Sequence, residues 1–298
     1  MKTRILVTGA NGQLGTCLKQ ISPLEGDLDF HYFSSSELNI VNFIKLEEAI
    51  KKIKYDFILN FAAYTDVEGA ESNNGLAYDV NGLGVKNLAK IGEKENIPII
   101  HISTDFVFDG GKNIAYCEDD PTNPISQYGI SKLAGENYLK ESLCRYIIIR
   151  TSWLYSPFSK NFFRTMIELS RKNKKISVVD DQVGSPTYAI DLAEVLVIII
   201  KKLSSDQKSS HFQELFHFSN SGEITWHHFA EKIFEYSDNF VHLNKVSSKQ
   251  LGLIASRPKY SALNSGKIKS IFNLDLRYWE DSLIRCIKVN DKLAEKNI

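Results

Sequence analysis

The chain has 298 residues, of which 43% are hydrophobic and 24% are charged, a composition typical of a globular protein with a large core. Its 36 basic and 36 acidic side chains give a formal net charge of zero, so charge favours neither a nucleic-acid partner nor an anionic membrane. The most apolar run, Val195 to Ile200, is too short to cross a bilayer, and no signal peptide opens the chain. The four cysteines lack metal-site spacing, which predicts reduced thiols, a cytoplasmic location and no bound metal.

The N-terminal segment predicts a strand, a glycine turn and a helix in direct succession. Arg4 to Thr8 is a β-branched and apolar run typical of a buried strand, and Leu14 to Gln20 has a helical pattern. Between them, Gly9 permits a tight turn, Gly12 lets the backbone approach a pyrophosphate, and Gly15 allows close helix–strand packing. Free N–H groups at the helix start favour phosphate. The context indicates a dinucleotide site, and a glycine turn without a ligand is the alternative.

The second predicted strand, Asp29 to Ser34, bears on the choice of cofactor. NAD enzymes often carry an acid near the end of this strand for the ribose 2′-hydroxyl, whereas this chain has Ser34-Ser35-Ser36. The missing acid removes one objection to a 2′-phosphate, yet no Arg is present to bind one. NADPH and NADH both stay possible, and NADPH is mildly favoured.

Strands and helices go on alternating through the first 150 residues. Helices are predicted over Phe43 to Ile53, Ala77 to Glu95 and Gln127 to Leu143, and strands over Asp56 to Asn60, Ile97 to Ser103 and Tyr146 to Arg150. The alternation predicts an α/β fold, a doubly wound parallel sheet of Rossmann type with right-handed crossovers. Such sheets bind ligands beyond the carboxyl ends of their strands.

Small and polar residues follow two of these strands. Phe61 to Thr65 come after the third strand, where small side chains would let a cofactor lie close to the backbone, although tight packing alone would also explain them. Ser103, Thr104 and Asp105 end the fourth strand and would place two hydroxyl groups and a carboxylate beside a nicotinamide. Helix capping or turn formation would account for them equally well.

Tyr128 and Lys132 form a Y-x-x-x-K pair on one face of the predicted helix, about one turn apart. A phenol with its usual pKa near 10 is a poor proton donor or acceptor at neutral pH, and a nearby Lys cation would lower that pKa. The pair alone is a weak signal, because a solvated helix face can show the same spacing. The glycine turn and the strand ends give it weight.

Beyond Thr151 the alternation is less regular. Helices are predicted over Asn161 to Lys172, Tyr188 to Lys202 and Trp226 to Tyr236, a strand over Ile176 to Val179, and the most polar, mobile stretch over Ser204 to Ser210. We expect residues 1–152 to form the dinucleotide-binding domain, to which later segments return. Residues 153–298 are expected to form mainly a smaller α/β substrate-binding lobe.

Several stretches together resemble the extended short-chain dehydrogenase/reductases and, within them, the dTDP-4-dehydrorhamnose reductase family. Val7 to Gly15 and Tyr128 to Glu136 match the superfamily pattern. More specific are the R-T-S-W, D-Q-x-G-x-P-T and S-x-R-P segments, which are Arg150 to Tyr155, Asp181 to Thr187 and Ser256 to Pro258. Further matching stretches are Asn60 to Thr65, with Glu68, Ala70 and Glu71, then Ser103 to Gly110 and Asn220 to Trp226.

The resemblance implies an NAD(P)H-dependent reduction of the C4 ketone of dTDP-4-dehydro-L-rhamnose to dTDP-L-rhamnose. Tyr128 would protonate the C4 oxygen as a hydride reaches C4, and Lys132 would hold the nicotinamide ribose and lower the Tyr128 pKa. Thr104 would donate a hydrogen bond to the substrate carbonyl or the developing oxyanion.

The resemblance also assigns the two ligands to particular residues. The expected cofactor-binding residues are Gly9, Asn11, Gly12, Gln13, Leu14, Asn39, Ile40, Ala62, Ala63, Tyr64, Thr65, Tyr128 and Lys132. The expected substrate-binding residues are Thr104, Asp105, Trp153 and Arg257. Asp105 would orient the deoxysugar by hydrogen bonding, and Trp153 by stacking on its apolar face. Arg257 would suit the substrate's diphosphate or nucleotide, and a structural ion pair is the rival role for it.

Three departures from the family pattern limit these assignments. Phe106 replaces a Tyr near the cofactor, and Asn39 replaces an Asp beside the adenine. Some relatives dimerise through magnesium-bound glutamates, but Thr16 and Cys17 occupy that neighbourhood here. We therefore expect a monomer or a metal-free homodimer.

Four alternative functions were compared with this reduction. Phe106 stands where a 4,6-dehydratase would need an acid, and no Cys/His acid–base pair for an epimerase–reductase is evident. A reductase of a related 4-keto nucleotide sugar stays open, because the shape of the pocket decides it. A non-catalytic, cofactor-binding regulatory subunit is the fourth, and it is disfavoured because Thr104, Tyr128 and Lys132 are all present.

Overall fold

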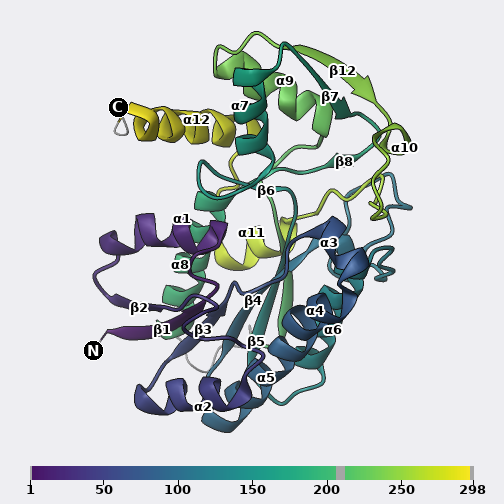
Figure 1. The fold of residues 1–298 in the computed structure, drawn as a ribbon. Helices are drawn as coiled ribbons and strands as arrows, with labels where there is room; N and C mark the ends of the chain where they lie inside the picture. The colour runs from purple at the N-terminus through teal and green to yellow at the C-terminus, as the bar shows by residue number, and fades with distance from the viewer. Residues whose placement is uncertain (1, 206–211, 296–298) are drawn as a thin grey trace.

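The centre of the fold is a six-stranded parallel sheet, seen in a computed structural model that describes residues 2–205 and 212–295 (Figure 1). The strand order is β10-β5-β4-β3-β1-β2. The strands are β1 (Thr3–Thr8), β2 (Leu28–Tyr32), β3 (Phe57–Asn60), β4 (Ile99–Thr104), β5 (Tyr146–Thr151) and β10 (Glu214–Phe218). The chain reverses its direction across the sheet between β1 and β3, which places the glycine turn at the topological switch point.

Helices cover both faces of the sheet, which confirms the predicted doubly wound α/β fold. Along β1, Ile5 and Val7 face one hydrophobic cluster and Leu6 faces the other, as the alternation of strand side chains requires. On the Leu6 face lie α2 (Phe43–Lys52), α5 (Gly84–Glu95) and α6 (Gln127–Lys140), and on the opposite face lie α1 (Gln13–Ile21), α8 (Ala189–Ser205) and α11 (Gly266–Phe272).

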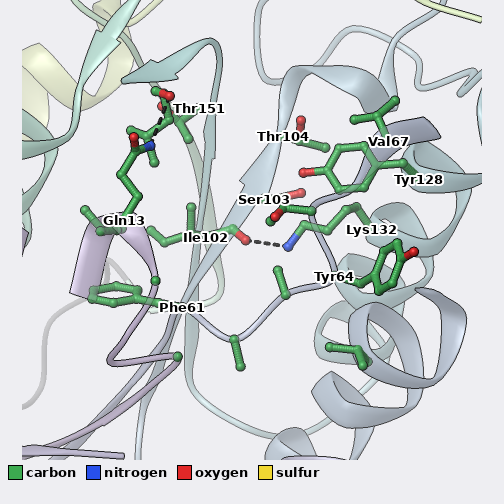
Figure 2. Close-up of a pocket in the computed structure, with 18 of the residues that line it drawn as sticks. Gln13, Phe61, Tyr64, Val67, Ile102, Ser103, Thr104, Tyr128, Lys132 and Thr151 are labelled. Carbon is green, nitrogen blue, oxygen red and sulfur yellow. Dashed lines mark hydrogen bonds between the residues drawn. The ribbon is translucent and has the colours of Figure 1, made fainter. Parts of the chain in front are cut away.

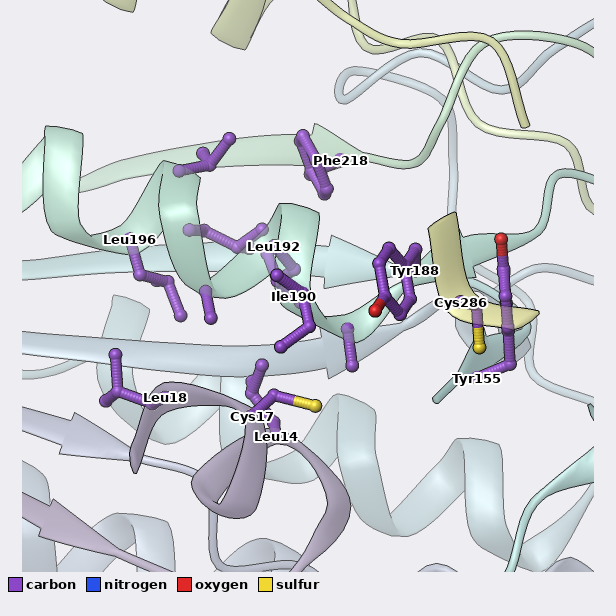
Figure 3. Packing of buried hydrophobic residues seen from close by; sticks show 14 of the residues in the cluster. Leu14, Cys17, Leu18, Tyr155, Tyr188, Ile190, Leu192, Leu196, Phe218 and Cys286 are labelled. Carbon is purple, nitrogen blue, oxygen red and sulfur yellow. The ribbon is translucent and has the colours of Figure 1, made fainter. Parts of the chain in front are cut away.

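The packing of α1 on α8 fixes the helix that begins at the glycine turn. Leu14, Cys17 and Leu18 of α1 belong to the same buried cluster as Leu192 and Leu196 of α8 (Figure 3). Burial of such apolar side chains contributes about 1.5–3 kcal/mol each to folding. The start of α1 is therefore held firmly against the sheet.

The predicted helix over Ala77 to Glu95 is interrupted. It divides into α4 (Asn74–Tyr78), a π-helical segment η2 (Asp79–Leu83) and α5. The side chain of Asn81 in η2 is fully buried and binds the backbone of Tyr64, a contact that the wider π turn permits.

Two further differences concern strands. The second strand ends at Tyr32, because the Ser34 N–H donates to the Glu37 carboxylate at 2.7 Å and begins a turn. The sixth strand, β10, was not predicted; it pairs in parallel with β5 along its whole length. The polar stretch 204–210 lies mostly outside the described residues.

A smaller lobe lies beyond the carboxyl ends of the sheet strands (Figure 1). Its helices are α7 (Phe162–Lys172), α9 (Trp226–Tyr236), α10 (Ser248–Leu251) and α12 (Trp279–Glu295). Its short strands pair as β6 (Leu154–Tyr155) with β9 (Thr187–Tyr188), β7 (Lys175–Val179) with β12 (His242–Val246), and β8 (Val183–Gly184) with β11 (Ile224–Thr225).

The remaining short helices are η1 (Ser22–Leu24), α3 (Val67–Ser72) and η3 (Asp105–Val107). In the second half of the chain, β10 pairs within the sheet and α8 and α11 pack on it, while Asp191 and Glu194 of α8 also form ion pairs with Arg285 of α12 in the lobe. The division into 1–152 and 153–298 stays a prediction. Among residues 2–205 and 212–295, no helix is both long and apolar enough to span a membrane.

Candidate active site

A cleft of about 950 Å³ lies at the carboxyl edge of the sheet, between the sheet and the smaller lobe. Every residue that the sequence assigned to a cofactor, a substrate or catalysis lines this cleft. They are Gly9, Asn11, Gly12, Gln13, Leu14, Asn39, Ile40, Ala62, Ala63, Tyr64, Thr65, Thr104, Asp105, Tyr128, Lys132, Trp153 and Arg257.

The glycine turn has the shape that a dinucleotide requires. Gly9 has φ +65°, and a Cβ there would lie 2.5 Å from the carbonyl carbon of Phe61. A Cβ at Gly15 would lie 2.7 Å from the Cα of Ala10, so β1 and α1 approach as closely as glycine allows. Gly12 is the N-cap of α1, lines the cleft and has no side chain to cap the first N–H groups of the helix. These residues fit a pyrophosphate.

The segment after β3 is held by side chains on both sides. The Ala62 N–H donates to Thr8 Oγ1 at 3.3 Å. Asn81 accepts from the Tyr64 N–H at 2.9 Å and donates to the Tyr64 carbonyl at 3.0 Å, and its amide also donates to Ser131 Oγ at 2.9 Å. Asn81 thus ties the expected cofactor segment to α6, one residue before Lys132.

Tyr128 and Thr104 place their hydroxyl groups together in the cleft (Figure 2). Burial raises the pKa of Tyr128 to about 12, while a hydrogen bond with Thr104 acts in the lowering direction. The phenol is therefore fully protonated at neutral pH and can serve as a proton donor. The edge of Phe106 packs against the Tyr128 ring, with centroids 5.5 Å apart.

Lys132 is almost completely buried, and its Nζ donates to the carbonyl of Ile102 at 2.7 Å (Figure 2). Burial lowers the pKa of Lys132 to about 8, and the Glu136 carboxylate acts in the opposite direction. The net pKa of Tyr128 moves upward, because desolvation of the phenol dominates. Lys132 is not among the groups that shift this pKa here, so the expectation that it lowers the pKa of Tyr128 stays a prediction.

Asp105 lies in η3, directly after β4. Its Oδ1 accepts from Thr104 Oγ1 at 3.0 Å, and its Oδ2 is buried without a hydrogen-bond partner among the described residues. Burial raises the pKa of Asp105 to about 6, while the neighbouring hydroxyl groups of Ser261 and Thr104 act in the lowering direction. A buried acceptor of this kind is satisfied when a ligand hydroxyl donates to it.

The other end of the cleft is built around Trp153. This residue has φ +46°, and its ring stacks on Trp226 with centroids 3.6 Å apart and planes 8° apart. A Cβ at Gly184 would lie 2.5 Å from the Trp153 ring, so the indole is packed closely there too. One face of Trp153 is already covered by an aromatic neighbour, and its stacking on a sugar stays a prediction.

Arg257 forms the structural ion pair and also lines the cleft, and its role toward a diphosphate stays a prediction. Its Nη1 lies 2.6 Å from Glu68 Oε1, which is the rival ion pair, and it lines the cleft as well. Glu68 also accepts from the Ile254 N–H at 2.8 Å and so holds the chain before Arg257. With 20% of its side chain exposed, Arg257 keeps access to solvent and ligands.

Sequence reasoning missed three lining residues that carry chemistry. Ile102 contributes a backbone carbonyl, for which a sequence holds no signal. Trp226 and Lys160 also line the cleft. Two signals could have drawn attention to them, since Trp226 ends a stretch that carries the family resemblance and Lys160 stands just before a predicted helix. Among the described charged side chains of the lining, three are cationic (Lys132, Lys160 and Arg257) and one is acidic (Asp105), which suits anionic ligands.

No group of three or more His, Cys, Asp or Glu side chains arranged to hold a metal occurs within residues 2–205 and 212–295. All four cysteines are free.

Comparison with known proteins gives consistent results. Residues 3–291 match the family model of the RmlD substrate binding domain. The chain is 36% identical over 289 residues to a dTDP-4-dehydrorhamnose reductase of Sinorhizobium fredii, covering 95% of this chain and 96% of that protein. It is 35% identical over 286 residues to one of Aggregatibacter actinomycetemcomitans, covering 94% and 97%.

A solved structure resembles the fold along its whole length. The crystal structure of dTDP-4-dehydrorhamnose reductase from Bacillus anthracis in complex with NADP superposes with a TM-score of 0.89 at 38% identity. The match covers 96% of this chain and 99% of that chain.

Proposed function

The chain belongs to the RmlD substrate binding domain family, and from that premise we propose that it reduces dTDP-4-dehydro-L-rhamnose to dTDP-L-rhamnose with NADPH or NADH. The observation that carries the proposal is the meeting of Tyr128, Thr104 and Lys132 at one point of a cleft that suits anions. A bound nicotinamide cofactor supplies the hydride, and the chain supplies the proton and the orientation.

In the proposed reaction, Tyr128 donates its phenolic proton to the C4 oxygen of the sugar. The upward shift of its pKa keeps this proton in place until charge develops on that oxygen. Thr104, whose hydroxyl lies beside that of Tyr128, would turn its one proton from Asp105 to the same oxygen. The buried ammonium of Lys132 would stabilise the phenolate after the transfer, since an opposite charge counts for more in a buried site.

We assign the cofactor to the side of the cleft formed by the sheet. Gly9, Asn11, Gly12, Gln13 and Leu14 would bind the pyrophosphate. Asn39 and Ile40 would contact the adenine, and Ala62, Ala63, Tyr64 and Thr65 would line the ribose and nicotinamide, with Lys132 on the ribose.

We assign the nucleotide sugar to the side formed by the lobe. Asp105 would accept a hydrogen bond from a sugar hydroxyl through its unpartnered Oδ2, and Trp153 would pack beside the apolar face of the deoxysugar. Arg257 would bind the diphosphate. Lys160, which the sequence did not single out, is a second cation for it.

The proposal also covers cofactor preference, cellular location, nucleic-acid partners and oligomeric state. We favour NADPH because a relative was solved with NADP and no acid follows β2 directly. Free thiols support a cytoplasmic location, and the balanced charge supports the absence of a nucleic-acid partner. Thr16 and Cys17 in place of metal-binding glutamates support a monomer or metal-free homodimer.

The test is to mix the purified protein with enzymatically prepared dTDP-4-dehydro-L-rhamnose and to follow NADPH and NADH oxidation separately. Rapid oxidation is expected, faster with NADPH. NMR of the product must then show L-rhamnose rather than its C4 epimer. Cofactor binding without oxidation would refute the proposal and favour a related 4-keto sugar or a regulatory subunit.

A further inference from the structure

Glu136 is a fully buried carboxylate one helical turn beyond Lys132 on α6. It accepts from Ser103 Oγ at 2.6 Å, and from Arg150 Nε at 2.9 Å and Nη2 at 2.7 Å. Lys140 adds a fourth contact at 3.2 Å. These bonds and the neighbouring charges hold the pKa of Glu136 down to about 2 although burial acts to raise it, so the carboxylate is ionised throughout the working range.

The contacts of Glu136 join the elements that carry the reacting groups. Ser103 lies on β4 between Ile102, whose carbonyl accepts from Lys132, and Thr104, whose hydroxyl meets Tyr128. Tyr128 and Lys132 lie on α6 together with Glu136. A slip of β4 against α6 would therefore break the Ser103–Glu136 bond and displace Thr104 from Tyr128 in the same motion.

We propose that Glu136 is a positioning residue for the reduction, acting in two separable ways. Through Ser103 it fixes the end of β4 against α6, and through its negative charge it keeps the buried Lys132 protonated. The inference rests on the proposed roles of Tyr128, Thr104 and Lys132.

The other titratable groups around Lys132 keep their charge state on the alkaline side of neutrality. From β4, His101 has a pKa well below its usual range because it is desolvated, and from β10 the pKa of His217 falls to about 3 for the same reason. Asp105 has a pKa of about 6 and Tyr128 of about 12, both raised by burial. Arg150 faces Glu136 from β5 as a permanent cation.

Groups on the helices that pack against α6 face other parts of it. Glu71 of α3 binds the N–H of Gln127 at the start of α6, and Lys86 of α5 lies over the ring of Tyr138 near its end. The alkaline limb of the activity profile therefore reports Lys132, whose pKa is about 8.

The experiment separates charge from geometry with a matched pair of variants. Glu136→Gln keeps the shape and an acceptor oxygen but removes the charge, whereas Ser103→Ala keeps the charge but removes the bond to β4. We would measure kcat/KM and the NADPH dissociation constant from pH 6 to 10. In Glu136→Gln, the alkaline limb of the curve of kcat/KM against pH should move about one to two pH units downward. This is the shift expected when an opposite charge near Lys132 is removed. Ser103→Ala should lower kcat severalfold with its limb unmoved.

A second variant serves as the control for loss of folding. Glu136→Gln leaves the buried Arg150 without its anion, which can unfold a protein, so the double variant Glu136→Gln/Arg150→Gln removes both charges. It should show a smaller downward shift, because the loss of the Arg150 cation acts to raise the pKa of Lys132. An unmoved limb in folded Glu136→Gln, or a limb that is not lowered in the double variant, would overturn the charge role, and an unchanged kcat in Ser103→Ala would overturn the geometric one. The NADPH titration distinguishes these failures from failure of the proposed function, since it needs no sugar substrate.

Discussion

The two ends of the cleft are formed by different kinds of structural element. At the end that holds Tyr128 and Lys132, which we propose as the catalytic end, the groups belong to regular elements of the sheet layer, and Lys132 and Glu136 are 2% and 0% exposed. The other end, which we propose for the nucleotide sugar, is lined by Trp153, Trp226 and Arg257 from three segments far apart in the chain. There the backbone of Trp153 has positive φ, and the Arg257 side chain is 20% exposed.

This difference indicates that the two ends of the cleft have different roles in the proposed reaction. Proton transfer depends on sub-ångström placement, and buried hydrogen bonds between β4, β5 and α6 provide it. The other end is formed by the loop residues Trp153 and Arg257 and by Trp226 at the start of α9, and such segments can change without disturbing the sheet. Substitutions at the catalytic end should therefore act on rate or cofactor binding, and those at the other end on the KM for the sugar.

The largest effect is expected at the proton donor. Tyr128→Phe removes one hydroxyl group and leaves the ring in contact with Phe106. We expect kcat to fall by about 10²–10⁴-fold, the usual contribution of a positioned acid, while the NADPH dissociation constant changes little. Steady-state turnover and a fluorescence titration measure the two quantities.

Tyr138→Phe is the matched control, because Tyr138 lies on the same helix and its hydroxyl bonds Tyr78 at 2.8 Å on the surface. Its turnover should equal that of the unmodified protein. A Tyr128→Phe variant with near-normal kcat would show that Tyr128 is not the proton donor and would contradict the assignment of the catalytic end.

The next effect concerns the glycine turn. Gly9→Ala places a methyl group 2.5 Å from the Phe61 backbone at φ +65°, so the turn must shift. We expect a loss of about 1–3 kcal/mol in the free energy of unfolding and a strong loss of NADPH binding. Thermal melting and cofactor titration test this.

Gly75→Ala is the control, since nothing lies within 4 Å of a Cβ there and the residue is on α4. Both measurements should stay near those of the original protein or show slight stabilisation. If Gly9→Ala still bound NADPH normally, the turn would not be the pyrophosphate site.

Sequence patterns specified the catalytic end because its signals are local. The spacing of Gly9, Gly12 and Gly15 and the four-residue step from Tyr128 to Lys132 depend on one turn and one helix, and the structure brings all five to the sheet edge where they were expected. The family resemblance built on these motifs is confirmed by the match over residues 3–291. The roles of the individual residues stay predictions.

The remaining features depend on contacts distant in sequence. The inward turn of Asn81 requires Tyr64 and Ser131 as partners, and β10 requires β5 beside it. The upward shift in the Tyr128 pKa depends on burial, which side-chain spacing does not encode. Trp226 stacks on Trp153 across more than seventy positions, so no periodicity could reveal it.

A smaller effect is expected at Arg257, and it separates the two roles of this residue. If Arg257 binds the diphosphate, Arg257→Met should raise the KM for the nucleotide sugar about tenfold to a hundredfold, because a hydrogen bond to a charged group contributes about 1.5–3 kcal/mol. Glu68→Gln would remove only the ion pair and should leave that KM nearly unchanged. Equal losses of thermal stability in both variants, with no change in the KM for the sugar, would show that Arg257 serves only as the partner of Glu68 in a structural ion pair.

The smallest effect should come from the aromatic pair. Trp226→Leu removes the ring that stacks on Trp153 at 3.6 Å but leaves Trp153 itself in the cleft. An aromatic pair contributes about 0.5–1.5 kcal/mol beyond its burial, so the KM for the sugar should rise about threefold to tenfold as Trp153 gains freedom. The NADPH dissociation constant should not change, because the cofactor side of the cleft shares no backbone element with α9. A parallel weakening of NADPH binding would show that the two ends of the cleft are coupled. The inference that they act separately on cofactor binding and on the KM for the sugar would then be wrong.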